Sequence, residues 1–228
     1  VRGVHFPSFA NELRQGGDGA ELYCRNINYM VAVIAPVLAV LATLAEPLIH
    51  FLFGSQWSDA ARISTYICTF SILTAPYCLY GLSLVAGGYV TLNMKAEVAI
   101  QACHVSILLT SLVIELEVVA MLLVISYLFE AMISQFALHR AFELSFGKLI
   151  SSIRGSLLLI PCSVVGPMLT IFASNKFDFA EHKFIILSVS GILAVVGWLL
   201  GIWVLEHVLK KDIIKISHTV TRRVLGEN

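Results

Sequence analysis

One group of polar residues in the middle of the chain has the spacing of a helix face. In an otherwise apolar stretch these positions are Asn93, Glu97, Gln101, His104, Ser111 and Glu115. At about 100° per residue, they fall within about 80° of one another around an α-helix. Polar and ionisable groups are costly inside a bilayer, so they usually face a bundle interior or a water-filled cavity. We therefore expect a polar stripe, made of these six residues, along one side of a membrane helix.

The polar stripe has two interpretations. In the first, it forms part of a cavity wall that contacts a polar substrate or carries protons through Glu97 and His104. In the second, it makes hydrogen bonds between neighbouring helices, and Asn93, Glu97 and Glu115 simply lie near the membrane interface. The residues alone leave both interpretations open.

A second candidate is Glu130, which lies inside a later apolar run and shares a helix face with Ser126 and Ser134. A carboxyl group buried there must be either protonated or paired. We expect a functional carboxyl group or, as the alternative, a capped side chain that reaches the nearby cytoplasmic surface of the membrane.

A third candidate, Arg25, stands with Asn26 and Asn28 at the start of the first long apolar run. A guanidinium group there can hold a phosphate through two parallel hydrogen bonds. The alternative is an anchoring cation on the cytoplasmic side of the membrane.

The composition is that of a membrane protein. Of the 228 residues, 58% are hydrophobic and 13% are charged, and the mean hydropathy is +0.86. Soluble domains carry roughly 25% charged residues, so this chain has too much apolar surface for a soluble fold. We predict an all-α integral membrane protein. The formal net charge is zero, which gives no attraction for nucleic acid.

Signatures of enzymes and of metal sites are missing from the sequence. It has no HExxH, GxSxG, Walker or aspartate-rich motif. None of the five cysteines forms a CxxC pair, so we expect them to be packing residues. We therefore predict a protein that is not an enzyme, with no cofactor, no catalytic residues and no metal site.

The apolar runs divide the chain into three parts. We expect a cytoplasmic loop or amphipathic segment over residues 1–25, a membrane bundle over 26–206 and a basic cytoplasmic tail over 207–228. Spanning a bilayer takes about 20 apolar residues. On that basis we predict about six membrane helices. The first ends at a break at Glu46-Pro47, after which residues 48–53 are either an interfacial turn of helix or the frayed end of the same span. The third and fourth are joined by a tight turn at 115–117. Their ranges are 27–45, 60–84, 94–114, 118–137, 157–173 and 184–205.

The distribution of lysine and arginine sets the expected orientation. With six spans, twelve of these residues fall on one side of the membrane and three on the other. Because cytoplasmic loops carry the excess of positive charge, both ends of the segment are expected in the cytoplasm.

The first part of the sequence resembles the Wzx-type polysaccharide flippase family, within the MATE-like and lipid II flippase-like superfamily. The resemblance covers residues 6 to about 102. It rests on several features in order: FPSFANEL at the start, Asp18 to Arg25, Pro36, AEPLIHFLFGSQW (residues 45–57), Ala60-Ala61, Pro76 and the Gly87-Gly88 pair. The region after the second span departs from the family pattern, because Ala86-Gly87-Gly88-Tyr89 replaces its usual asparagine and alanine-arginine-glycine.

The resemblance implies a partial MATE-like bundle that is the later part of a longer protein, with a missing N-terminal bundle as its partner. Such proteins move undecaprenyl-pyrophosphate-linked oligosaccharide repeat units across the bacterial cytoplasmic (inner) membrane, as in O-antigen or exopolysaccharide export. The implied partners are the lipid-linked oligosaccharide and membrane lipids. Alternatives are a MATE-like exporter of small molecules or drugs and a non-transport membrane protein of glycan assembly.

Overall fold

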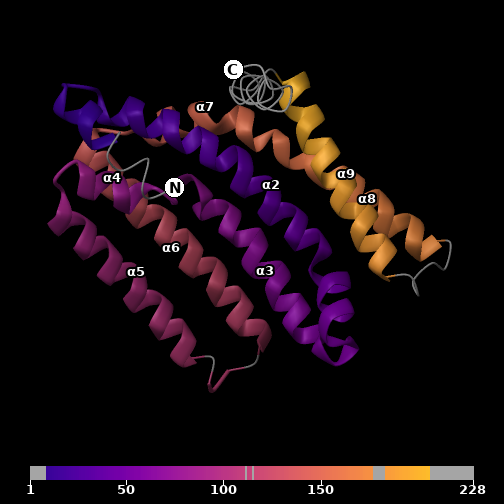
Figure 1. Cartoon of the computed structure of the whole chain (residues 1–228). Coiled ribbons are helices and arrows are strands. Elements are labelled where there is room, and N and C mark those ends of the chain that lie inside the picture. The colour runs from indigo at the N-terminus through magenta and orange to yellow at the C-terminus, as the bar shows by residue number, and fades with distance from the viewer. Residues whose placement is uncertain (1–8, 111, 115, 177–182, 206–228) are drawn as a thin grey trace, which may run out of the picture.

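The computed structural model describes residues 9–110, 112–114, 116–176 and 183–205, and all the regular structure in these ranges is helical (Figure 1). This confirms the predicted all-α class. A short helix covers residues 9–14, inside the predicted amphipathic segment. The elements that follow are α2 (Gly19–Phe53), η1 (Ser55–Trp57), α3 (Ser58–Thr74), η2 (Ala75–Tyr77), α4 (Tyr80–Ala86), α5 (Val90–Thr110), α6 (Leu116–Phe142), α7 (Phe146–Leu157), α8 (Leu159–Lys176) and α9 (Lys183–Val204).

Helix α2 is the element around which the others pack. It has 35 residues, which corresponds to a length of about 52 Å. Helix α3 packs along one side of it, and α7, α8 and α9 pack along the other (Figure 1). The hairpin of α5 and α6 reaches α2 mainly through α3 and η2.

The helix does not break at Glu46-Pro47, and residues 48–53 are the end of the same helix, which was one of the two expectations for them. Helix α2 continues through Pro36 and Pro47 and ends only at Gly54, whose φ of 91° lies in the left-handed region. A proline removes one backbone donor from a helix, and packing neighbours can hold the remaining turns in place. The break occurs instead at Pro76, where η2 separates α3 from α4 inside the predicted second span.

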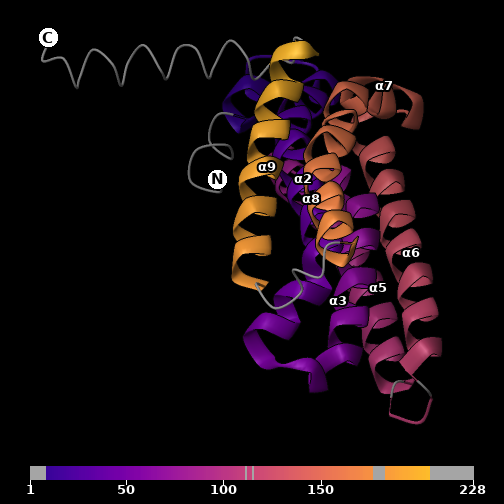
Figure 2. The same cartoon turned by 90° about the vertical axis from the view of Figure 1, so that its right-hand side faces the viewer.

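Five helical segments are long and apolar enough to cross a membrane, which makes this a multi-pass arrangement. They are Gly19–Phe53, Ser55–Ala86, Leu122–Phe142, Phe146–Ser174 and Phe184–Val204. The third predicted span, α5, has 21 residues and runs antiparallel to α6 (Figures 1 and 2). It is absent from this set because its polar side chains lower its mean hydropathy.

The α5–α6 hairpin has its turn earlier than predicted. Helix α5 ends at Thr110 and α6 begins at Leu116, whereas the sequence suggested a turn at 115–117. The predicted tail over 207–228 lies outside the described residues. The opposite flank of α2 carries a second hairpin, α8 and α9, which Figure 2 shows side by side.

Candidate functional site

A polar network joins α4, α5 and α6 inside the bundle. The hydroxyl group of Tyr80 donates a hydrogen bond to Glu97 Oε1 at 2.6 Å. Two turns further along α5, His104 Nε2 lies 3.6 Å from Glu130 Oε2 on α6. Tyr80 is buried, and Glu97, His104 and Glu130 are half-buried. Each carboxylate of this α4–α6 network therefore meets a partner from another helix.

A glycine lets α4 approach the polar side of α5. A Cβ atom on Gly81 would lie 3.0 Å from Asn93 Oδ1 and 3.6 Å from Glu97 Oε1. The Asn93 oxygen is buried and accepts no hydrogen bond within the described part of the chain. A buried acceptor without a partner is unfavourable. The Asn93 oxygen is therefore a group, beside Glu97, that would gain from accepting a hydrogen bond.

Further hydrogen bonds connect the bundle around this network. Tyr77 donates to Gln135 Oε1 at 3.3 Å, and Gln135 Nε2 donates to the Leu144 carbonyl at 2.8 Å. The hydroxyl group of Tyr23, on α2, donates to the Pro76 carbonyl at 2.8 Å. These bonds hold η2, where the chain breaks between α3 and α4, against both α2 and α6.

The structure brings some of the predicted site residues together and separates others. Asn93, Glu97 and His104 of the polar stripe turn toward α4 and α6, and Glu130 joins them. Gln101 is exposed on the outside of α5. Ser111 and Glu115 lie outside the described residues. The sequence analysis missed Tyr80, whose only signal was its place just after the Pro76 break.

Arg25 lies on α2, apart from the α4–α6 network. Its guanidinium group pairs with Glu12 Oε2 at 2.6 Å, and its side chain is 54% exposed. Nearby, Lys148 Nζ lies 3.3 Å from Asp18 Oδ2. Asp18 also caps α2 by accepting from the Ala20 N–H at 2.8 Å. That backbone hydrogen bond, with a smaller effect from Lys148, lowers the pKa of Asp18 from its ordinary value of 3.8.

The side of α2 that faces α7 and α9 carries a row of backbone acceptors. The carbonyl oxygens of Cys24, Asn28 and Ala32, spaced one turn apart, each accept a hydrogen bond from a side chain. The donors are Ser152 Oγ at 3.1 Å, Ser156 Oγ at 2.9 Å and Trp198 Nε1 at 2.8 Å, respectively. This row of hydrogen bonds attaches α7 and α9 to α2.

Two pockets lie outside the α4–α6 network. An apolar groove of about 330 Å³ runs between α2 and α9, where Pro36 and Trp198 are among its walls. A pocket of mixed polarity, about 380 Å³ in volume, lies between the end of α2 and the start of α3. Among the described residues, no three His, Cys, Asp or Glu side chains are grouped to hold a metal ion.

The protonatable groups of the α4–α6 network are arranged for helix-to-helix hydrogen bonding. The two pairs, a phenol with one carboxylate and an imidazole with the other, can also hold or exchange a proton. The contacts are therefore those expected from the second interpretation of the polar stripe. Its role as a cavity wall stays a prediction.

Comparison with known protein families matches the first part of the chain. Residues 1–62 match a family described as polysaccharide biosynthesis protein. The matched segment contains α2, the AEPLIHFLFGSQW stretch and the first residues of α3. No curated protein and no solved structure matches the chain. The match supports a role in polysaccharide biosynthesis, in agreement with the broad family that the sequence resembles, for a multi-pass membrane protein.

Proposed function

We propose that this chain is part of a flippase that moves undecaprenyl-pyrophosphate-linked oligosaccharide repeat units across the bacterial inner membrane. The observation that carries the proposal is the match of residues 1–62 to the polysaccharide biosynthesis family, on a chain with five helices apolar enough to span a membrane. We further propose that α5, with its 21 residues, also crosses the membrane, so that six spans place both ends of the segment in the cytoplasm. We also propose that the chain is the later part of a longer, two-bundle protein.

A flippase must shield a charged, sugar-bearing headgroup from hydrocarbon while the lipid tail stays outside. A polar surface between two rocking helical bundles does this. In our proposal, the surface of this bundle is supplied by the predicted site residues Asn93, Glu97, Gln101, His104 and Glu130. The proposed role involves no bond chemistry, and so it requires neither catalytic residues nor a cofactor.

Arg25 has a separate role in this proposal. It pairs with Glu12 near the start of α2, and its side chain is 54% exposed. An exposed guanidinium group can exchange a carboxylate partner for a phosphate, because both accept two parallel hydrogen bonds. We propose that Arg25 meets the pyrophosphate of the substrate before the headgroup enters the bundle.

The test is a translocation assay with the protein in proteoliposomes. The probe is a fluorescent undecaprenyl-pyrophosphate-linked oligosaccharide in both leaflets, and a quencher that cannot cross the membrane reports its accessibility. We expect vesicles containing the protein to lose nearly all fluorescence, whereas protein-free vesicles keep the signal of the inner leaflet. An equal residual signal in both kinds of vesicle would overturn the proposal.

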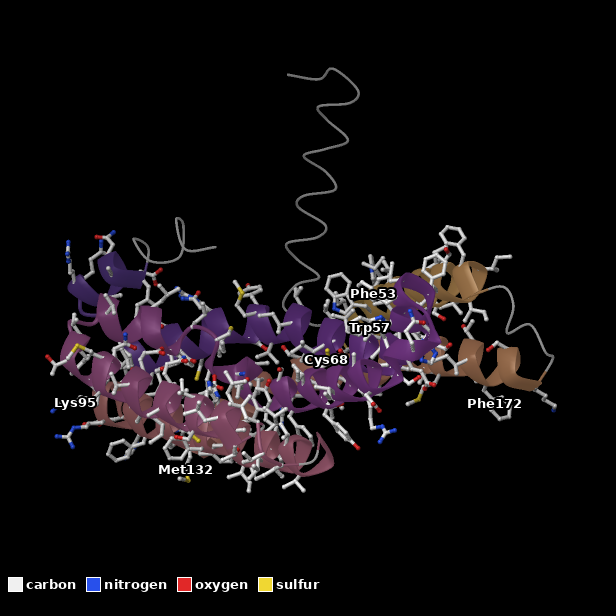
Figure 3. The ribbon with its side chains drawn as sticks, turned by 90° about the horizontal axis from the view of Figure 1, so that it is seen from below. Phe53, Trp57, Cys68, Lys95, Met132 and Phe172 are labelled. Carbon is white, nitrogen blue, oxygen red and sulfur yellow. The ribbon has the colours of Figure 1, made fainter. Side chains whose placement is uncertain are left out.

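Matched variants assign the activity to the α4–α6 network. Glu97→Gln and Glu130→Gln remove the carboxylate charges with little change in shape, and we expect each to slow translocation about tenfold or more, equivalent to about 1.4 kcal/mol. The control is Met132→Leu, because Met132 is 66% exposed on α6 and lies on the outer side of the bundle (Figure 3). Equal rates in all three variants would remove the network from the mechanism.

A further inference from the structure

The pocket between α2 and α3 lies at the opposite end of the apolar span from Arg25. Glu46 contributes to it from α2, and 21 residues separate Glu46 from Arg25. At 1.5 Å per residue this is about 31 Å, close to the thickness of the hydrocarbon core of a bilayer. Phe53 and Trp57 lie at the same end of the molecule (Figure 3), as aromatic residues at a membrane surface do.

The walls of this α2–α3 pocket combine opposite charges with hydroxyl groups. Its lining residues are Glu46, Ser58, Ala61, Arg62, Thr65 and Tyr66. The carboxylate accepts hydrogen bonds and the guanidinium group donates them. Arg62 also pairs with Asp59, since its Nη2 lies 3.8 Å from Asp59 Oδ1, so its guanidinium charge is balanced within the protein and does not mark the pocket as a site for a free anion. A neutral ligand with both donors and acceptors fits these walls better than an ion or a hydrocarbon chain.

The hydroxyl groups of the pocket are held in fixed directions. Ser58 Oγ donates to the Ser55 carbonyl at 2.6 Å and lies 3.0 Å from His50 Nε2. Thr65 Oγ1 donates to the Ala61 carbonyl at 3.1 Å. Since each hydroxyl group uses its proton within the protein, its oxygen can still accept a hydrogen bond from a ligand hydroxyl group.

An aromatic ring completes one wall. Tyr66 is 39% exposed, and its ring stacks on that of Phe70 with a centroid distance of 6.4 Å and an interplanar angle of 13°. This support fixes the plane of an otherwise exposed ring. Ala61 is buried beside it and leaves room, because it has the smallest side chain after glycine. A pyranose ring has apolar C–H faces and polar edges, so it can stack on Tyr66 while its hydroxyl groups reach the side chains of Glu46 and Arg62.

We propose that the α2–α3 pocket binds a neutral sugar unit. The proposal rests on the proposed function, because it assigns the pocket to the saccharide of the lipid-linked substrate. The volume of about 380 Å³ lies within the range of small-molecule sites. The pocket lies at the end of the bundle opposite to Arg25. It would therefore hold the sugar portion at the far side of the membrane from Arg25, while the lipid tail remains in the membrane.

The test measures binding of free sugars to the protein in lipid nanodiscs. The probes are the methyl glycosides of glucose, galactose, rhamnose and N-acetylglucosamine, observed by saturation-transfer difference NMR. We expect transfer to the ring protons of at least one glycoside. Tyr66→Ala and Glu46→Gln should each weaken its binding about tenfold, equivalent to about 1.4 kcal/mol. Tyr66→Phe keeps the ring and should retain binding.

Thr69→Ala is the matched control, because Thr69 is exposed one turn beyond Thr65 on α3 and lies outside the pocket. The Thr69→Ala variant should bind the glycoside as tightly as the unaltered protein does. The proposal is overturned if no glycoside shows transfer, if Tyr66→Ala binds normally, or if inorganic sulfate displaces the glycoside completely, since the last result would indicate an anion site.

The same variants in the translocation assay separate this inference from the proposed function. Sugar binding without translocation by the unaltered protein would refute the flippase proposal and leave the sugar site standing. Translocation that proceeds normally in the Tyr66→Ala variant, together with unchanged sugar binding, would refute the sugar site and leave the flippase proposal standing.

Discussion

Trp198 supplies the hydrogen bond that Pro36 removes from Ala32. Proline has no N–H, so the carbonyl four residues before Pro36, that of Ala32, loses its helical donor. The indole Nε1–H of Trp198 donates to this oxygen at 2.8 Å, and Ala32 is fully buried. A side chain on α9 thus satisfies a gap in α2, although Ala32 and Trp198 are 166 positions apart in sequence.

This relationship predicts coupling between the two positions. Trp198→Phe should lower the free energy of unfolding by about 1–3 kcal/mol, because it leaves a buried acceptor without a donor. Pro36→Ala restores the missing backbone N–H. The loss caused by Trp198→Phe should therefore be smaller in a Pro36→Ala background. Unfolding in mixed detergent micelles measures all four proteins of the cycle, and strictly additive effects would contradict the assignment.

Two glycines on α9 should respond differently to the same change. A Cβ atom on Gly197 would overlap the Cys162 carbonyl on α8, whereas one on Gly191 would meet nothing within 4 Å. Gly197→Ala should lower the free energy of unfolding by about 1–3 kcal/mol, because the tightly packed α8–α9 hairpin must separate. Gly191→Ala should be neutral or stabilising, since alanine favours a helix by about 1 kcal/mol over glycine.

The measurement is thermal unfolding of each glycine variant in the same detergent, beside the unaltered protein. Equal midpoints for the two variants would show that close approach of α8 and α9 does not limit stability.

Asp18 should make stability depend on pH at the acidic end. Its pKa in the folded protein is lowered, first by the Ala20 N–H and then by Lys148. A lowered folded-state pKa means that the ionised form stabilises the fold. This contribution is complete above the unfolded value of about 3.8 and is lost as the pH falls through the folded-state pKa.

Asp18→Asn isolates that contribution, because asparagine can still cap the helix. The free energy of unfolding of both proteins is measured from about pH 7 down to about pH 3. The gap between the two values should be constant at first. The gap should then narrow as the pH falls below the unfolded-state pKa. A gap that widens on acidification would contradict the sign of the shift.

The hydroxyl group of Tyr80 should stabilise the α4–α5 contact. Tyr80→Phe keeps the ring but removes the donor to Glu97, and we expect a loss of about 1 kcal/mol in the free energy of unfolding. Tyr89→Phe is the matched change, because Tyr89 is 41% exposed and contacts Phe142 through its ring. Chemical unfolding of both variants provides the comparison. An equal loss of unfolding free energy in the two variants would show that the hydrogen bond from Tyr80 to Glu97 adds no stability of its own.

The sequence by itself determined the all-α class of the protein and the places of its main apolar segments. Apolar runs, and glycines such as Gly87 at the end of α4, act within a few residues, so they can be seen without the fold. The polar stripe was also visible, because helical periodicity places Asn93, Glu97 and His104 on one face whatever lies opposite.

Only the tertiary structure decided which of these groups meet a partner. Gln101 lies within the same 80° sector but is exposed, because the direction from which α4 and α6 approach selects one edge of the stripe. Tyr80 and Glu130 come to α5 from other helices, and no local pattern encodes that pairing. The effect of each proline was decided in the same way: α2 continues through Pro36, where Trp198 satisfies the freed carbonyl, while the chain breaks at Pro76. A proline removes a donor locally, but the packing around it decides whether the helix goes on, since α2 also continues through Pro47.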